Sequence, residues 1–86
     1  MYEDDDDRFE AALRLAEDNP SSGAQALRSI AADDGVDPDT RFEAAARLAE
    51  VDEDLAAEAL RSIVADAGFD SDIRSEAAAR LAEIGG

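Results

Sequence analysis

Apolar residues recur at helical spacing along the chain, and polar residues divide them into five segments. In the segment 38–50, Phe42 and the residues three, four and seven places after it are all apolar, which is typical of an amphipathic helix. The segment 53–67 gathers its apolar residues on one face in the same way. No strand-like alternation interrupts the pattern. We therefore predict five helices, over residues 4–17, 20–34, 38–50, 53–67 and 71–84.

Residues that favour helix starts and helix ends stand between these segments. Asp37 precedes Pro38, which suits a first helical turn because proline has no N–H to leave unsatisfied. Gly35 and Gly68 are expected to terminate the second and fourth helices, and the apolar residue after each glycine is expected to fold back onto the helix before it. The predicted N-terminal capping residues are Asp4, Asn19, Asp37, Asp52 and Asp70. The predicted fold-back contacts are Val36 with Ala31 and Phe69 with Val64.

The five segments belong to a tandem repeat. Residues 8–40 align with residues 41–73 without a gap, and 20 of the 33 positions are identical. A third copy begins at Arg74 and matches 9 of the first 11 residues of the second copy. Because one helix pair cannot bury its apolar face alone, stacked pairs are expected to share one core. We predict a single domain over 1–86, with repeats 8–40 and 41–73, a half repeat 74–86, and an acidic extension 1–7 leading into the first helix.

The sequence of the repeat resembles a known family. The middle copy reads DPDTRFEAAARLAE and is followed by a second helix with Ala56, Leu60, Ile63 and Asp66. This pattern is similar to the bacterial HEAT-like repeats of the PBS-lyase type, whose units open with D-P-x-x-R-x-x-A-A-x-x-L. The likeness runs from about residue 4 to 85. It departs from the family where alanine replaces the usual glycine after the first helix, at Ala16, Ala49 and Ala82.

The resemblance implies an all-α fold and a role in binding. The implied architecture is a right-handed α-solenoid of antiparallel helix pairs, with five helices in two and a half repeats. In such an array the second helices line the concave side, and another protein binds there. The resemblance does not name that protein.

Composition sharpens this interpretation mainly by exclusion. The chain has 86 residues, a formal charge of −15, and no Cys or His, so a disulfide, a Cys/His zinc site and a His-assisted nucleophile are excluded. The loops 33–39 and 66–72 are acidic but lack the spacing of an EF-hand. The run Asp4–Asp7 is interpreted as a helix start. We expect no enzyme activity, no metal and no cofactor.

The charge and hydropathy also bear on partners and location. No run of 18 apolar residues is present, so we expect no membrane span. The acidity argues against direct binding of nucleic acid or anionic lipid. The expected location is the cytoplasm.

The eight arginines all fall on repeat positions. Arg8, Arg41 and Arg74 lie four residues after a predicted cap, and we expect them to form a ladder that ties successive units together. Arg14, Arg47 and Arg80 lie between glutamates at i−4 and i+3, which predicts ion-pair rows on a solvated face. Arg28 and Arg61 belong instead to the second helices. With their neighbours they form the candidate protein-binding set, for which plain solvated surface remains the alternative: Gln25, Arg28, Ser29, Glu58, Arg61 and Ser62.

The acidity has two alternative interpretations that do not involve a repeat groove. The chain could be an acidic decoy that mimics nucleic acid and binds a basic protein. Alternatively, the charge could be an adaptation to high salt, in which case it says nothing about partners.

The last helix has no predicted partner helix after it. We therefore expect its apolar residues to face solvent in part, with modest stability or self-association as the result. These residues are Ala78, Ala79, Leu81, Ala82 and Ile84.

Overall fold

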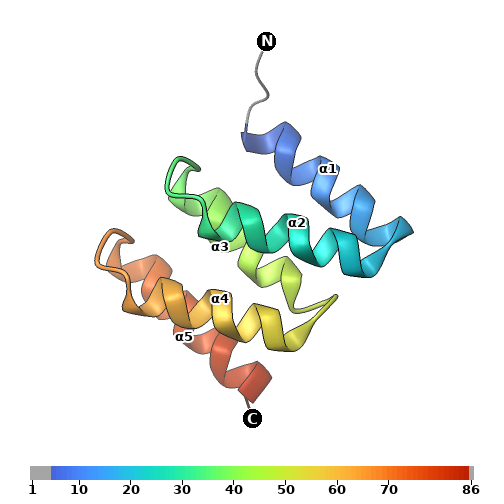
Figure 1. Ribbon diagram of the computed structural model, residues 1–86. Coiled ribbons are helices and arrows are strands. Elements are labelled where there is room, and N and C mark those ends of the chain that lie inside the picture. The colour runs from blue at the N-terminus through green and yellow to red at the C-terminus, as the bar shows by residue number, and fades with distance from the viewer. Residues whose placement is uncertain (1–4, 86) are drawn as a thin grey trace.

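The computed structural model describes residues 5–85, which contain five α-helices and no β-strand (Figure 1). The helices are α1 (Asp5–Asp18), α2 (Pro20–Ala32), α3 (Pro38–Leu48), α4 (Glu53–Ala65) and α5 (Ser71–Gly85). Each end lies within two residues of the predicted one. The all-helical fold class is therefore confirmed, and the connections are short, with a single residue, Asn19, between α1 and α2.

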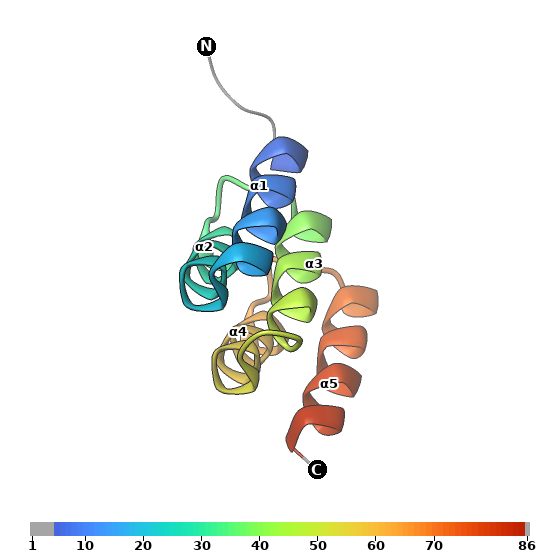
Figure 2. The same cartoon turned by 90° about the vertical axis from the view of Figure 1, so that its right-hand side faces the viewer.

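The helices lie in two layers. α1, α3 and α5 form one layer, and α2 and α4 form the other (Figure 2). Each helix contacts the next helix along the chain, in the opposite layer, and the next-but-one helix in its own layer. The Cα atoms span 33 × 28 × 13 Å, so the molecule is a flat array in which each helix of the α2/α4 layer packs between two helices of the other layer.

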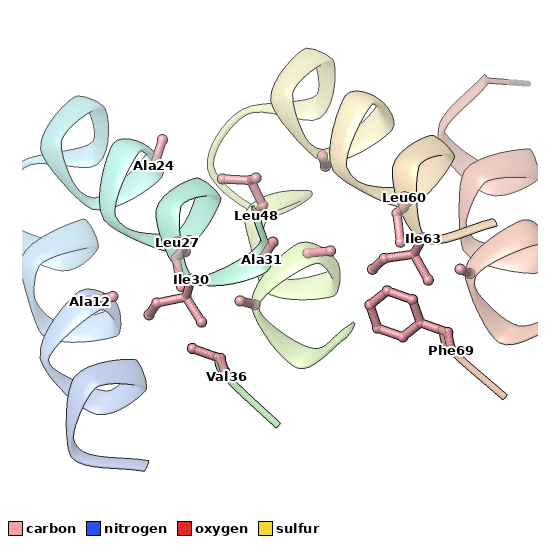
Figure 3. Close-up of a cluster of buried hydrophobic side chains, with 14 residues drawn as sticks. Ala12, Ala24, Leu27, Ile30, Ala31, Val36, Leu48, Leu60, Ile63 and Phe69 are labelled. Carbon is pink, nitrogen blue, oxygen red and sulfur yellow. The ribbon is translucent and has the colours of Figure 1, made fainter. Parts of the chain in front are cut away.

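A single apolar core runs between the two layers (Figure 3). Its largest fully buried side chains are Leu27 and Ile30 of α2, the aligned Leu60 and Ile63 of α4, and Leu48 of α3. Seven alanines complete the packing: Ala12, Ala24, Ala31, Ala44, Ala45, Ala56 and Ala77. Because alanine lets helices approach closely, a chain with few large apolar residues still forms a continuous core.

Three of the predicted helix caps are confirmed. The side chains of Asn19, Asp52 and Asp70 each accept a hydrogen bond from a backbone N–H two or three residues later, at 3.0–3.3 Å, which satisfies otherwise unpaired donors. Asp37 differs, because its side chain makes no capping bond. Its own N–H instead donates to Asp5 Oδ2 at 3.1 Å. The predicted cap Asp4 lies outside the described residues.

The prediction of glycine-terminated helices is wrong. α2 ends at Ala32, and Asp33 after it is extended (φ −87°, ψ 109°). Neither Gly35 nor Gly68 has a positive φ. Asp33 and Asp66 each accept the N–H of the glycine two residues later, at 2.9 and 2.8 Å. This aspartate turn replaces the left-handed residue that the prediction required.

The apolar residues after both glycines are nevertheless buried in the core. Val36 and Phe69 occupy aligned positions, and both belong to the core cluster. Each aspartate turn therefore directs an apolar side chain inward from the connection between two repeats.

The predicted arginine ladder is confirmed at Arg41 and Arg74. Arg41 Nε donates to the carbonyl oxygen of Ala31 at 3.0 Å, and Arg74 Nε donates to that of Val64 at 3.3 Å. Both carbonyls belong to the preceding repeat. The Arg41 guanidinium also lies 4.6 Å from the centroid of the Phe69 ring in its own repeat, a cation–π distance. Arg41 thus joins two consecutive units.

Arg8 has no preceding repeat in this array and binds elsewhere. Its Nη1 donates to Asp33 Oδ2 at 2.7 Å. This hydrogen bond, with a second from the Gly35 N–H, holds the pKa of the Asp33 carboxyl below its ordinary value. The ion pair links the first turn of α1 to the end of α2.

The last helix is only sparsely buried. Ala77 is the only buried residue of α5, while Leu81 and Ile84 are half-buried. Ala78, Ala79 and Ala82 are exposed. The prediction that this helix faces solvent in part is confirmed.

Candidate functional site

The six residues of the predicted site lie in the layer formed by α2 and α4, and all six are exposed. α2 supplies three of them and α4 the other three. We call this set the α2–α4 surface: Gln25, Arg28, Ser29, Glu58, Arg61 and Ser62. The surface arises because the same helical face is polar in both repeats while the opposite face carries the large core residues.

An ion pair crosses this surface. Arg28 Nη2 lies 3.7 Å from Glu58 Oε1, and both side chains are about half exposed. The two residues are 30 positions apart and belong to consecutive repeats. An exposed pair of this kind contributes at most about 1 kcal/mol to stability, so its main effect is to orient both side chains at the junction of the helices.

A groove of about 130 Å³ lies at the same junction. It is lined by Arg28, Ala31, Ala32, Glu58, Ala59 and Ser62. A neighbouring groove on α2, of about 330 Å³, is lined by Gln25, Arg28, Ser29 and Ala32. Alanines form the apolar part of both grooves and the other lining residues are polar or charged, so the grooves can accept a small apolar side chain and hydrogen-bond or pair with charged groups beside it.

The structure brings five of the six predicted residues into these grooves. Arg61 is exposed but lines neither of them. The groove alanines, Ala31, Ala32 and Ala59, were not predicted as site residues. Alanine carries no functional group, so the sequence holds little signal for these three residues. The one available signal was the position of Ala59 next to Glu58, which was a predicted site residue. Their role depends on how α2 and α4 lie side by side.

The first-helix layer presents a different surface. Arg14 pairs with Glu10 at 3.7 Å, and Arg47 pairs with Glu50 at 3.9 Å. These contacts confirm the predicted rows at two of the three arginines. Each pair lies within one repeat, so the layer offers isolated exposed pairs and no ion pair between repeats at these positions.

The described residues were also searched for metal-binding clusters, buried polar groups and membrane-spanning helices. Over residues 5–85, no group of three or more carboxylates could hold a metal ion, and no charged or polar side chain is buried. In the same part of the chain, no helix has both the length and the apolar character that spanning a bilayer requires.

The chain was compared with known proteins. No protein-family model, curated protein or solved structure matches it. The repeat and the surfaces described above are therefore the basis for the proposals that follow.

Proposed function

We propose that this chain is a non-enzymatic, HEAT-like α-solenoid module that binds another protein along the α2–α4 surface. The observation on which the proposal rests is the groove at the α2–α4 junction, with its ion pair between Arg28 and Glu58. The 33-residue repeat and the two-layer packing support a stack of helix pairs, and the right hand of that stack is what the family resemblance implies.

The composition of the surface suits a protein partner. Arginine is enriched at protein interfaces, where its guanidinium makes several hydrogen bonds and stacks on aromatic rings. The alanine floor of the groove lets a partner side chain approach the helix backbones closely. Serines at both edges, Ser29 and Ser62, add donors and acceptors. The proposed interface is therefore mixed in charge, with a shallow apolar centre.

The test is a charge reversal with a matched control. A double variant, Arg28→Glu with Arg61→Glu, changes the α2–α4 surface. The control, Arg14→Glu with Arg47→Glu, makes the same change of four charge units on exposed residues of the other layer. Proteins captured from the source cell by the wild type should be lost with the first variant and retained with the control. Capture that survives the first variant, or disappears with both, contradicts the proposal.

The acidic decoy is the second candidate, and the charge of −15 is the observation that favours it. The same two variants distinguish it. A decoy that depends on overall negative charge should bind its basic partner at least as well after either reversal. Its binding should also disappear by about 0.3 M salt, because exposed charges are strongly screened there.

A further inference from the structure

One side of α1 carries a stripe of four residues spaced three or four positions apart. The aligned residues in the second repeat and in α5 are covered by neighbouring parts of the chain. The stripe of α1 is Asp7, Ala11, Leu15 and Asp18, and all four residues are exposed. The aligned stripe of the second repeat is Thr40, Ala44 and Leu48 of α3 with Val51 just after that helix, and that of α5 is Ile73, Ala77, Leu81 and Ile84. Every residue of these two is buried or half-buried. Leu15 is 41% exposed, whereas Leu48 is 0% exposed.

The array itself shows what covers such a stripe. α3 packs against α1 and α2 of the preceding repeat, so its stripe is covered by helices. On α1 the same position is open and forms a groove of about 280 Å³. The groove is lined by Ala11 and Leu15 of α1 and by Ala26, Ser29 and Ile30 of α2, with Arg8 at its edge. In the second repeat, the equivalent surface of α3 is covered by helices. The groove on α1 therefore corresponds to a surface that a helix can cover.

The charge of the α1 stripe differs from that of the covered ones. Ala11 and Leu15 keep the residues of the repeat, but Asp7 stands where the others have Thr40 and Ile73, and Asp18 where they have Val51 and Ile84. Asp7 lies one turn before Ala11, and Asp18 lies one turn after Leu15. An apolar centre is thus flanked by a carboxylate at each end.

The nearby arginines do not neutralise these two carboxylates. Arg8 pairs with Asp33, and Arg14 pairs with Glu10. None of the arginines of residues 5–85 forms an ion pair with Asp7 or Asp18. A ligand with cationic groups at both ends would complement them.

We propose that the α1 stripe and the adjoining edge of α2 bind a basic amphipathic helix of another protein. The helix would place apolar side chains against Leu15 and lysines or arginines near Asp7 and Asp18, which are about 16 Å apart along α1 at 1.5 Å per residue. A second copy of this chain is a poor occupant, because each copy carries a charge of −15 and like charges repel. The site shares Ser29 with the α2–α4 surface, but its stripe lies on α1, and it does not depend on the function proposed for the α2–α4 surface.

The test uses the full chain and two synthetic peptides. The first is a 20-residue helix with a leucine and alanine stripe and lysines in its first and last turns; the second replaces those lysines with glutamates. In low salt, the lysine peptide should bind the wild type and the glutamate peptide should not, as measured by fluorescence anisotropy. Amide chemical shifts should change at Ala11 and Leu15.

A matched pair of variants locates the charges. Asp7→Thr with Asp18→Val gives α1 the aligned residues of the second repeat and should weaken binding of the lysine peptide about tenfold, in line with the loss of two exposed ion pairs. Glu76→Thr with Glu83→Val removes two exposed carboxylates from α5 and should change binding less than twofold. Leu15→Ser should also weaken binding.

Several outcomes would overturn the proposal. These are no binding of the lysine peptide at millimolar concentration, equal weakening by both carboxylate variants, or shift changes confined to α4 and α5. Sedimentation equilibrium that shows a wild-type dimer abolished by Leu15→Ser, together with no peptide binding, would assign the stripe to a second copy instead. The circular dichroism spectrum of each variant verifies that the helices remain folded.

Discussion

The two full repeats place identical residues in different surroundings. Leu15 and Leu48 occupy the same position in residues 8–40 and 41–73, yet Leu15 is 41% exposed and Leu48 is fully buried. Arg8 and Arg41 are also aligned, and each pairs with an aspartate, Arg8 with Asp33 and Arg41 with Asp34. Arg41 in addition binds a backbone carbonyl and faces the Phe69 ring. Position in the array decides what a repeat residue does, because only the second repeat has a neighbour on both sides.

The helix pairs inside the two repeats differ as well. At Gly23 in α2, an added Cβ would collide with the backbone of Ala16 in α1. The aligned residue in α4 is Ala56, which is fully buried and has its methyl group accommodated. α1 and α2 therefore approach more closely at this position than α3 and α4 do. The glycine is required by packing and not by backbone conformation.

The largest predicted difference concerns the two leucines. Leu48→Ala should lower the free energy of unfolding by about 4 kcal/mol, because it removes a fully buried side chain and leaves a cavity. Leu15→Ala should cost less, about 1–2 kcal/mol, because 41% of Leu15 is already exposed to solvent. Urea unfolding followed by circular dichroism measures both. Equal losses would show that Leu15 is covered in solution, and the comparison of the repeats would fail.

Exchange of the two small residues is the second test. Gly23→Ala should destabilise the chain by about 3 kcal/mol, because the new methyl group meets helix backbone that no rotamer change can move. Ala56→Gly should cost about 1 kcal/mol from helix propensity. If Gly23→Ala stabilises the chain, as alanine does at an open helical site, the close approach of α1 and α2 is not present.

The aligned arginines should differ by a smaller amount. Arg41→Gln should cost about 2 kcal/mol, since it removes a charge-assisted hydrogen bond and a cation–π contact from a side chain that is only 13% exposed. Arg8→Gln should cost at most about 1 kcal/mol, because its ion pair is solvated. Thermal unfolding of both variants gives the comparison, and a larger loss at Arg8 would reverse it.

The smallest expected effect is a pH dependence at Asp33. Its pKa is lower in the folded state than the ordinary value near 3.9. The ionised form therefore stabilises the fold above that ordinary value, and this contribution is lost as the pH falls through the folded pKa. Asp33→Asn should be less stable than the wild type at pH 7, with the gap closing toward pH 2. In an Arg8→Gln background the gap should shrink at every pH; an undiminished gap would assign the effect to the Gly35 N–H alone.

Much of the fold follows from sequence because the repeat supplies each helix signal two or three times. Helix ranges and the caps at Asn19, Asp52 and Asp70 depend only on neighbouring residues. The glycine-terminated ends failed because Asp33 and Asp66 compete for the glycine N–H, and sequence spacing alone does not rank the two arrangements. The correct predictions and this wrong one all concern local interactions. The wrong one concerns the choice between a left-handed glycine and an aspartate turn at the end of a helix.

The sequence predicted which helix faces carry the candidate site, but it did not predict the groove between them. Helical spacing placed Arg28 and Glu58 on the polar sides of their helices. Their ion pair joins residues 30 positions apart, so it depends on the distance between α2 and α4, which the repeat pattern does not specify. The role of Ala59 in the groove was missed for the same reason, because a methyl group becomes a lining surface only when a second helix lies beside it.

The contacts between helices reach only the next and next-but-one element along the chain. No distant parts of the chain therefore have to meet before the core forms, and the loop-closure entropy that slows many folding reactions is small. We expect folding on the microsecond to millisecond scale, starting in either repeat. Unfolding should begin at the terminal helices α1 and α5, each of which has one buried residue, so their amide hydrogens should exchange with solvent well before those of α2 and α3.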